Sequence, residues 1–62
     1  MFYWVMQEIG SEVVAHGPYR TKSGRDNRFG QVFGGEVHKY NSASQDPEVA
    51  KQDFWADRIR SL

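Results

Sequence analysis

Residues 2–9 open the chain with a run of aromatic and branched side chains, a composition typical of a β-strand. The Gly-Ser pair at 10–11 suits a two-residue hairpin turn with glycine first. Residues 12–16 are therefore predicted to return as a second strand. The Gly-Pro pair at 17–18 is predicted to end that strand, because proline cannot donate a hydrogen bond to a neighbouring strand.

A two-residue turn also predicts the register of this hairpin, in which Ile9 pairs with Glu12 and Val5 with His16. Side chains then alternate between the two faces of the sheet. One face carries Tyr3, Val5, Gln7, Ile9, Glu12, Val14 and His16, and the other carries Phe2, Trp4, Met6, Glu8, Val13 and Ala15. The second set is the more apolar, so it is predicted to face the core.

The middle of the chain predicts a first helix. Thr21 or Ser23 would cap its start, and apolar side chains at helical spacing extend it to about Phe33. The Gly-Gly pair at 34–35 is a strong signal for the end of a helix.

Residues 36–41 are predicted to form a third strand, and a second helix follows. Asp, Pro and Glu stand in succession at 46–48, which places a capping acid before proline at the first helical position. This helix would run to about Arg60. Its Phe54 is expected to pack in the core against Trp4 of the first strand.

The order of these elements predicts a small α+β fold, with a single domain over residues 1–62. A right-handed crossover would place the third strand parallel to the second. The first strand would then lie in the middle of a three-stranded, antiparallel-type sheet in the order 2-1-3. Both helices are expected to cover one face, which would leave the face with Tyr3 and Val5 open.

A chain of 62 residues buries only about 60 % of its extended surface, so its stability is marginal without a further staple. Cysteine is absent, which excludes disulfides, and His16 and His38 are too few for a zinc or haem site. No cofactor or metal is therefore expected. Self-association through the open sheet face or a strand edge remains as a way to stabilise so small a chain. The interface candidates are Tyr3, Val5, Val14 and His16.

The charge of the chain is zero at pH 7 but unevenly distributed. Residues 16–39 hold five cations against two acids, a net of +3. Closely spaced cations beside a helix start are a modest nucleic-acid footprint, because backbone amides there also attract phosphate. An ordinary solvated helix start fits the same residues, so both interpretations stay open. The candidate phosphate contacts are Arg20, Lys22, Arg25, Arg28 and Lys39.

The layout resembles the small N-terminal hybrid-binding domain of eukaryotic-type ribonuclease H, which is also found in viroplasmin-like proteins. That family opens with an aromatic strand, as at 2–5 here. Its hairpin leads to a glycine, an aromatic residue and a threonine before the first helix, here Gly17, Tyr19 and Thr21. Its third strand carries an apolar, two basic and an aromatic residue, as at 37–40.

This resemblance implies the same fold and contacts with duplex or hybrid nucleic acid. Lys22 stands where that family usually has a tryptophan, and His38 replaces one of its paired lysines. The contact positions that the resemblance implies are Tyr19, Lys22, His38 and Lys39.

No catalytic residue is expected, because no serine lies in a sequence context that points to a neighbouring base and acid. The apolar stretch at 1–6 is too short for a signal core or a membrane span, which makes a cytoplasmic protein without membrane partners the default expectation.

Two functions stay open. The chain is predicted to be a non-enzymatic module that binds nucleic acid through residues 16–39, or else a protein-interaction or homodimerisation module that uses the exposed sheet face.

Overall fold

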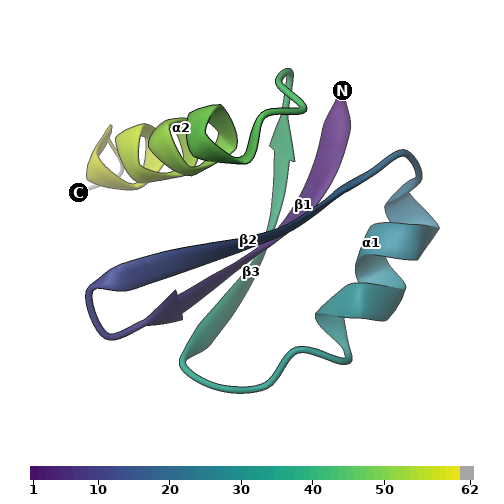
Figure 1. Ribbon diagram of the computed structural model, residues 1–62, viewed down its shortest axis with the longest axis horizontal. Coiled ribbons are helices and arrows are strands. Elements are labelled where there is room, and N and C mark those ends of the chain that lie inside the picture. Colours follow the sequence, from purple (N-terminus) through teal and green to yellow (C-terminus); the bar gives the residue numbers. More distant parts are fainter. Residues whose placement is uncertain (61–62) are drawn as a thin grey trace.

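The computed structural model describes residues 1–60, which form one sheet and two helices (Figure 1). The elements follow in the order β1 (Phe2–Ile9), β2 (Glu12–Tyr19), α1 (Lys22–Phe29), β3 (Glu36–Ser42) and α2 (Pro47–Arg60). The sheet has the strand order β2-β1-β3, and β1 is antiparallel to both neighbours. The predicted α+β layout is confirmed, including the central position of the first strand.

The hairpin between β1 and β2 has the predicted register, with Ile9 opposite Glu12 and Val5 opposite His16. Gly10 makes the turn possible, because its φ of 61° lies in the left-handed region that glycine adopts freely. Alternation along β1 then points Trp4 towards the core, where it has no exposed surface.

β2 continues through Tyr19 and does not end before the Gly-Pro pair as predicted. A shift in register between Tyr3 and Val5 absorbs residues 17–18, so that Tyr19 lies opposite Tyr3. Proline is tolerated here because β2 is an edge strand with no second neighbour to receive a hydrogen bond. Gly17 is required at this bulge, since its φ is 137° and a Cβ would lie 3.1 Å from Trp4 Cε3.

The two helices lie on opposite faces of the twisted sheet, so the expectation that both cover one face is wrong (Figure 1). On one face, the Phe54 ring of α2 packs against Tyr40 of β3, with ring centroids 5.5 Å apart. On the other face, the Arg25 guanidinium of α1 lies 5.3 Å from the centre of the Tyr3 ring.

The physical reason for this arrangement is that β1 is apolar on both faces. Trp4 and Met6 point to the α2 side and Val5 to the α1 side, and none of the three has any exposed surface. A central strand of this kind needs cover on both faces, and one helix supplies each.

The main core lies between α2 and the sheet. Its buried residues are Trp4, Met6, Val13, Ala50 and Phe54, against which Phe2, Ala15 and Tyr40 pack. The predicted pairing of Trp4 with Phe54 on facing elements is confirmed. The predicted start of α2 is also correct, since Asp46 Oδ1 accepts a hydrogen bond of 2.9 Å from the backbone N–H of Glu48.

α1 begins as predicted but ends early. Thr21 caps it, because its Oγ1 accepts a 3.1 Å hydrogen bond from the backbone N–H of Gly24. The helix stops at Phe29 and not near Phe33, so the glycines at 34–35 do not end it. None of the helices in residues 1–60 has the length and apolar character needed to cross a membrane.

Candidate nucleic-acid interface

Charge is divided between two regions of the molecule. The region around α1 carries five cations and one acid, a net of +4; these residues are Arg20, Lys22, Arg25, Arg28, Lys39 and Asp26. The rest of the chain carries three cations and seven acids, a net of −4, which together with the first region gives the overall charge of zero. The basic segment of the sequence therefore becomes one basic region in space.

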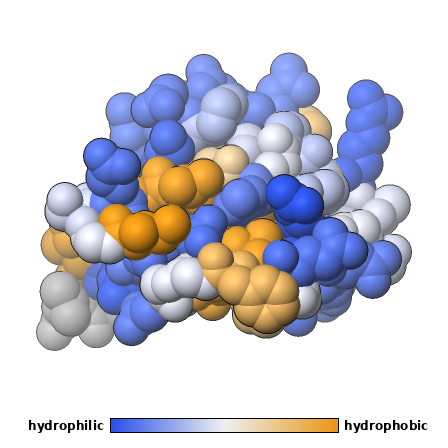
Figure 2. Space-filling view, turned by 60° about the horizontal axis from the view of Figure 1, so that its bottom comes forward, coloured by the Kyte–Doolittle hydropathy of each residue, from blue (hydrophilic) through white to orange (hydrophobic). Residues whose placement is uncertain are grey.

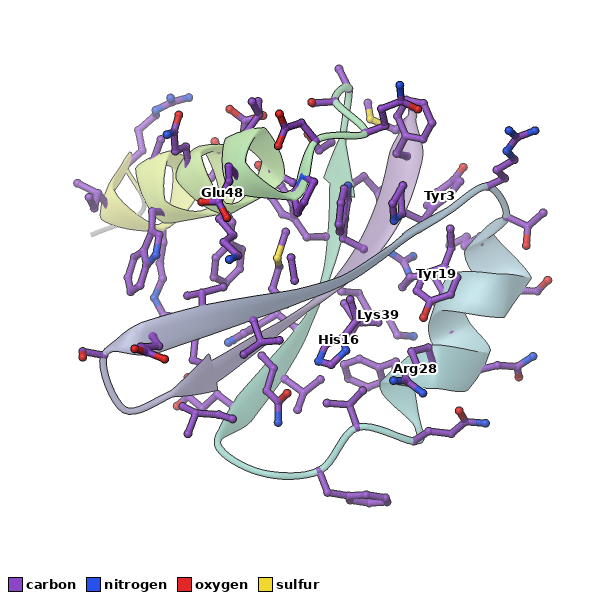
Figure 3. The ribbon with its side chains drawn as sticks, in the orientation of Figure 1. Tyr3, His16, Tyr19, Arg28, Lys39 and Glu48 are labelled. Carbon is purple, nitrogen blue, oxygen red and sulfur yellow. The ribbon has the colours of Figure 1, made fainter. Side chains whose placement is uncertain are left out.

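Three of these cations are freely available to a partner. Arg20, Lys22 and Arg28 are exposed, and none of them has an ion-pair partner among residues 1–60. We call these three residues the α1 cationic surface. Tyr19 is half-buried and lies beside α1, the helix that carries Arg28 (Figure 3). The acidic Glu48 lies on the other helix, α2.

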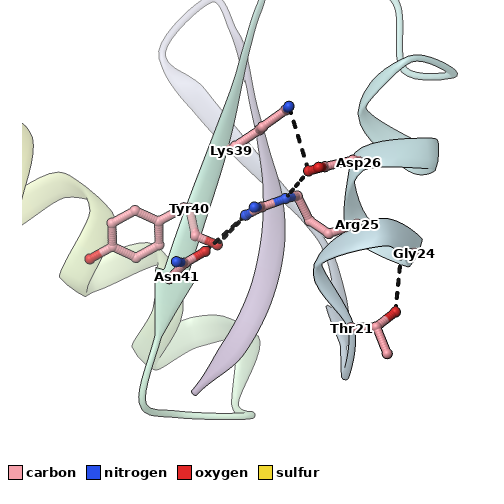
Figure 4. Close-up of polar contacts among 7 residues, drawn as sticks. All are labelled: Thr21, Gly24, Arg25, Asp26, Lys39, Tyr40 and Asn41. Carbon is pink, nitrogen blue, oxygen red and sulfur yellow. Dashed lines mark hydrogen bonds and ion pairs between the residues drawn. The ribbon is translucent and has the colours of Figure 1, made fainter.

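Arg25 does not belong to this exposed surface, which contradicts its predicted role as an exposed phosphate contact. Its side chain is 3 % exposed. Nε donates a 2.8 Å hydrogen bond to Asp26 Oδ1, and Nη1 donates one of 2.8 Å to Asn41 Oδ1 and a longer one of 3.4 Å to the Tyr40 carbonyl (Figure 4). Arg25 therefore fastens α1 to β3.

Lys39 lies at the margin of the α1 cationic surface. It points to the α1 face, away from the main core, with its Nζ 4.9 Å from the centre of the Phe29 ring and 3.5 Å from Asp26 Oδ1. The hydrogen bond from Arg25 holds the pKa of the Asp26 carboxyl below its usual value, and the Lys39 charge lowers it further. Asp26 thus offsets part of the local positive charge.

His38 is separated from the other residues that the family resemblance implies. Neighbouring residues of a strand point to opposite faces, so His38 faces α2 while Lys39 faces α1. The His38 ring lies 5.5 Å from the Phe54 ring, and its Nε2 is 3.1 Å from Glu8 Oε1. The structure therefore brings Tyr19, Lys22 and Lys39 to one side and excludes His38 from it.

His38 instead belongs to a polar cluster that the sequence did not reveal. The ligand atoms of Glu8, Glu36 and His38 lie within 4.8 Å of one another, a spacing that suits a metal ion. The Arg58 guanidinium, however, forms an ion pair with Glu8, lies 3.7 Å from Glu36 Oε2 and 3.4 Å from His38 Nε2. A protein cation already pairs with these carboxylates, so the cluster ties α2 to the sheet.

The pairing between β1 and β3 brings the residues of that cluster together. Glu8 lies directly opposite Glu36, and His38 lies opposite Met6, two residues before Glu8 on the same face of β1. These residues are distant in the sequence, and no short motif connects them.

The four residues predicted to form an interface differ in accessibility: Val14 is exposed, Tyr3 and His16 are half-buried, and Val5 is buried. Val5 is fully buried on the α1 face, and Tyr3 is half-buried beneath Arg25, so that part of the face is closed. Val14 remains 39 % exposed. Burial lowers the pKa of the His16 ring, and the nearby Arg28 charge lowers it further.

Gln7 is a buried polar residue whose role the sequence did not show. Its Nε2 donates hydrogen bonds of 3.0 and 3.1 Å to the carbonyls of Phe33 and Gly34, and its Oε1 lies 2.9 Å from His16 Nε2. Because the amide oxygen can only accept, His16 Nε2 is the donor in this pair. Gln7 therefore holds the loop that follows α1 against the sheet.

Comparisons of the chain with protein-family models, curated protein sequences and solved structures return no match. The resemblance to the hybrid-binding domain therefore stays a prediction.

Proposed function

We propose that this domain binds the phosphate backbone of duplex or hybrid nucleic acid through the α1 cationic surface, with Lys39 at its edge. The observation that supports this proposal is the separation of charge, with +4 around α1 and −4 in the rest of a chain whose net charge is zero. A neutral protein with separated charge presents one side to a polyanion, because the opposite side is repelled.

The proposed contacts are mainly electrostatic. Arg20, Lys22 and Arg28 are exposed and can each release a counterion from the nucleic acid when they meet a phosphate. Three such contacts correspond to a slope of about −2.7 in a plot of log K against log salt concentration for a duplex. Contacts of this kind position a protein without reading sequence, so little preference among base sequences is expected.

The test is a fluorescence-anisotropy titration of a short labelled duplex and of a matching RNA–DNA hybrid at about 50 and about 200 mM salt. The double variant Arg20→Ala with Lys22→Ala should bind more weakly and lose about 1.8 from the salt slope. Both side chains are exposed, so its melting temperature should match that of the parent.

The matched control is the double variant Lys51→Ala with Arg60→Ala on α2, which removes the same total charge from the other side of the sheet. These two cations pair with Glu48 and Asp57 at the surface, so their loss should affect folding little. The control should keep the salt slope of the parent. Equal loss of binding in both double variants, or no binding by the parent at the lower salt concentration, would contradict the proposal.

A further inference from the structure

α1 is short and covers only part of its sheet face. Ile9 and Val14, at the hairpin end of that face, remain 49 % and 39 % exposed, and Phe33 in the adjoining loop is 84 % exposed. We call these three residues the hairpin-face patch. Figure 2 looks towards this end of the molecule and shows hydrophobic side chains gathered there among polar ones.

The hairpin-face patch is held in a defined position. Gln7, which lies opposite Val14 and is 7 % exposed, donates hydrogen bonds to the Phe33 and Gly34 carbonyls. The backbone of the most exposed aromatic residue is thus fixed by a buried side chain. A surface that is already ordered loses little conformational entropy when a partner covers it.

Opposite charges stand at the two ends of the patch. Glu12, Val14 and His16 follow one another on the same face of β2, so Val14 lies midway between the other two. Arg28 lies near His16 and marks the positive end (Figure 3), and Glu12, opposite Ile9, marks the negative end. Neither Glu12 nor Arg28 has an ion-pair partner within residues 1–60.

We propose that the hairpin-face patch is the interface of a symmetric homodimer, whose two-fold axis passes close to Val14. A symmetric interface places the same surface of each copy against the other, in reversed order. Glu12 of each copy would then meet Arg28 of the other, and the apolar side chains would be buried between these two charge pairs. A single copy cannot form this pair, because the two residues lie at opposite ends of the patch.

The size of the molecule is compatible with such an interface. The described chain exposes 4229 Å². A standard interface takes about 800 Å² from each partner, which is about a fifth of that surface. Arg28 belongs to both proposed surfaces, whereas Arg20 and Lys22 lie outside the patch. The dimer does not depend on nucleic-acid binding, and it is therefore tested without nucleic acid.

The first test is sedimentation of the parent, without nucleic acid, from low micromolar to near-millimolar concentration. The average mass should rise from that of one chain to that of two. Val14→Glu should raise the dissociation constant of the dimer at least about tenfold, because two carboxylates would face each other at the axis. Phe33→Asp is a second variant at a more exposed position and should act in the same direction.

The second test is a charge swap. Glu12→Arg and Arg28→Glu should each weaken the dimer, and the variant with both changes should recover the association of the parent. Ile59→Glu on α2, at a position that is 67 % exposed, is the control and should associate like the parent. The proposal is overturned if the parent stays a monomer throughout, if the double variant does not recover, or if the control weakens association as much as Val14→Glu.

Discussion

Arg25 shows how one residue can look like part of a binding surface and serve the fold. Lys22, Arg25 and Arg28 are spaced three apart, so the sequence alone predicts the same role, an exposed phosphate contact, for each of them. What separates them is which side of α1 meets the sheet, and that depends on Asn41, far along the chain on β3. Local spacing therefore predicted the basic region but not which of its members are free.

Arg25→Ala is expected to destabilise the domain by about 2–3 kcal/mol, because hydrogen bonds that involve a charged group contribute roughly that much and the Arg25 side chain that makes them is buried. Arg25→Lys should fall between this variant and the parent, since lysine keeps the charge but not the planar fork of donors. Urea unfolding measures all three. The control Lys22→Ala should change stability by less than about 0.5 kcal/mol, and similar losses in Arg25→Ala and Lys22→Ala would contradict the structural role.

Among the elements, starts and turns followed local signals, whereas the ends of β2 and α1 did not. The Gly-Ser turn and the caps at Thr21 and Asp46 were all predicted, because each depends on residues within a few positions. The end of β2 depends on its place at the sheet edge. The end of α1 also escaped prediction, because Phe33 continues the helical spacing of apolar residues although the chain has already turned towards β3.

The Gly-Gly pair at 34–35 illustrates this difference. It was predicted to stop a helix, but its role lies in the approach to β1. Gly35 has a φ of 63°, and a Cβ there would overlap the carbonyl oxygen of Glu8. The pair is therefore needed for the entry into β3.

Gly35→Ala is expected to cost at least about 1–2 kcal/mol from the left-handed backbone alone, with a further loss from the overlap with Glu8. Gly30→Ala is the matched control, because Gly30 has a φ of −72° and the nearest atom to a new Cβ is 3.7 Å away. That control should gain about 0.4–1 kcal/mol through a less flexible unfolded chain. Thermal melting of both variants checks the pair, and equal shifts would show that Gly35 is not needed for the turn.

At the scale of the whole molecule, the two faces of the sheet carry different groups of residues. The α2 face holds the main core and the Arg58 cluster, whereas the α1 face carries the free cations and the hairpin-face patch. The strand order and the core followed from the hydrophobic pattern. The placement of the helices on opposite faces was not predicted, because one face of β1 was expected to meet solvent. Val5, however, makes that face apolar as well.

Phe54→Ala is therefore expected to unfold the whole domain and not merely release α2. Phe54 contacts Tyr40 and His38 and completes the cluster around Trp4, and truncation of a buried phenylalanine costs about 3–5 kcal/mol. Domains have only about 5–15 kcal/mol of stability in total, and one of this size is expected near the lower limit.

Ile59→Ala, on the same helix but 67 % exposed, should melt close to the parent. Melting followed by far-UV circular dichroism and by tryptophan fluorescence should show one shared, strongly lowered transition for Phe54→Ala. A variant that melts within a few degrees of the parent, or that loses helix signal while the sheet persists, would show that α2 is not part of a single cooperative core.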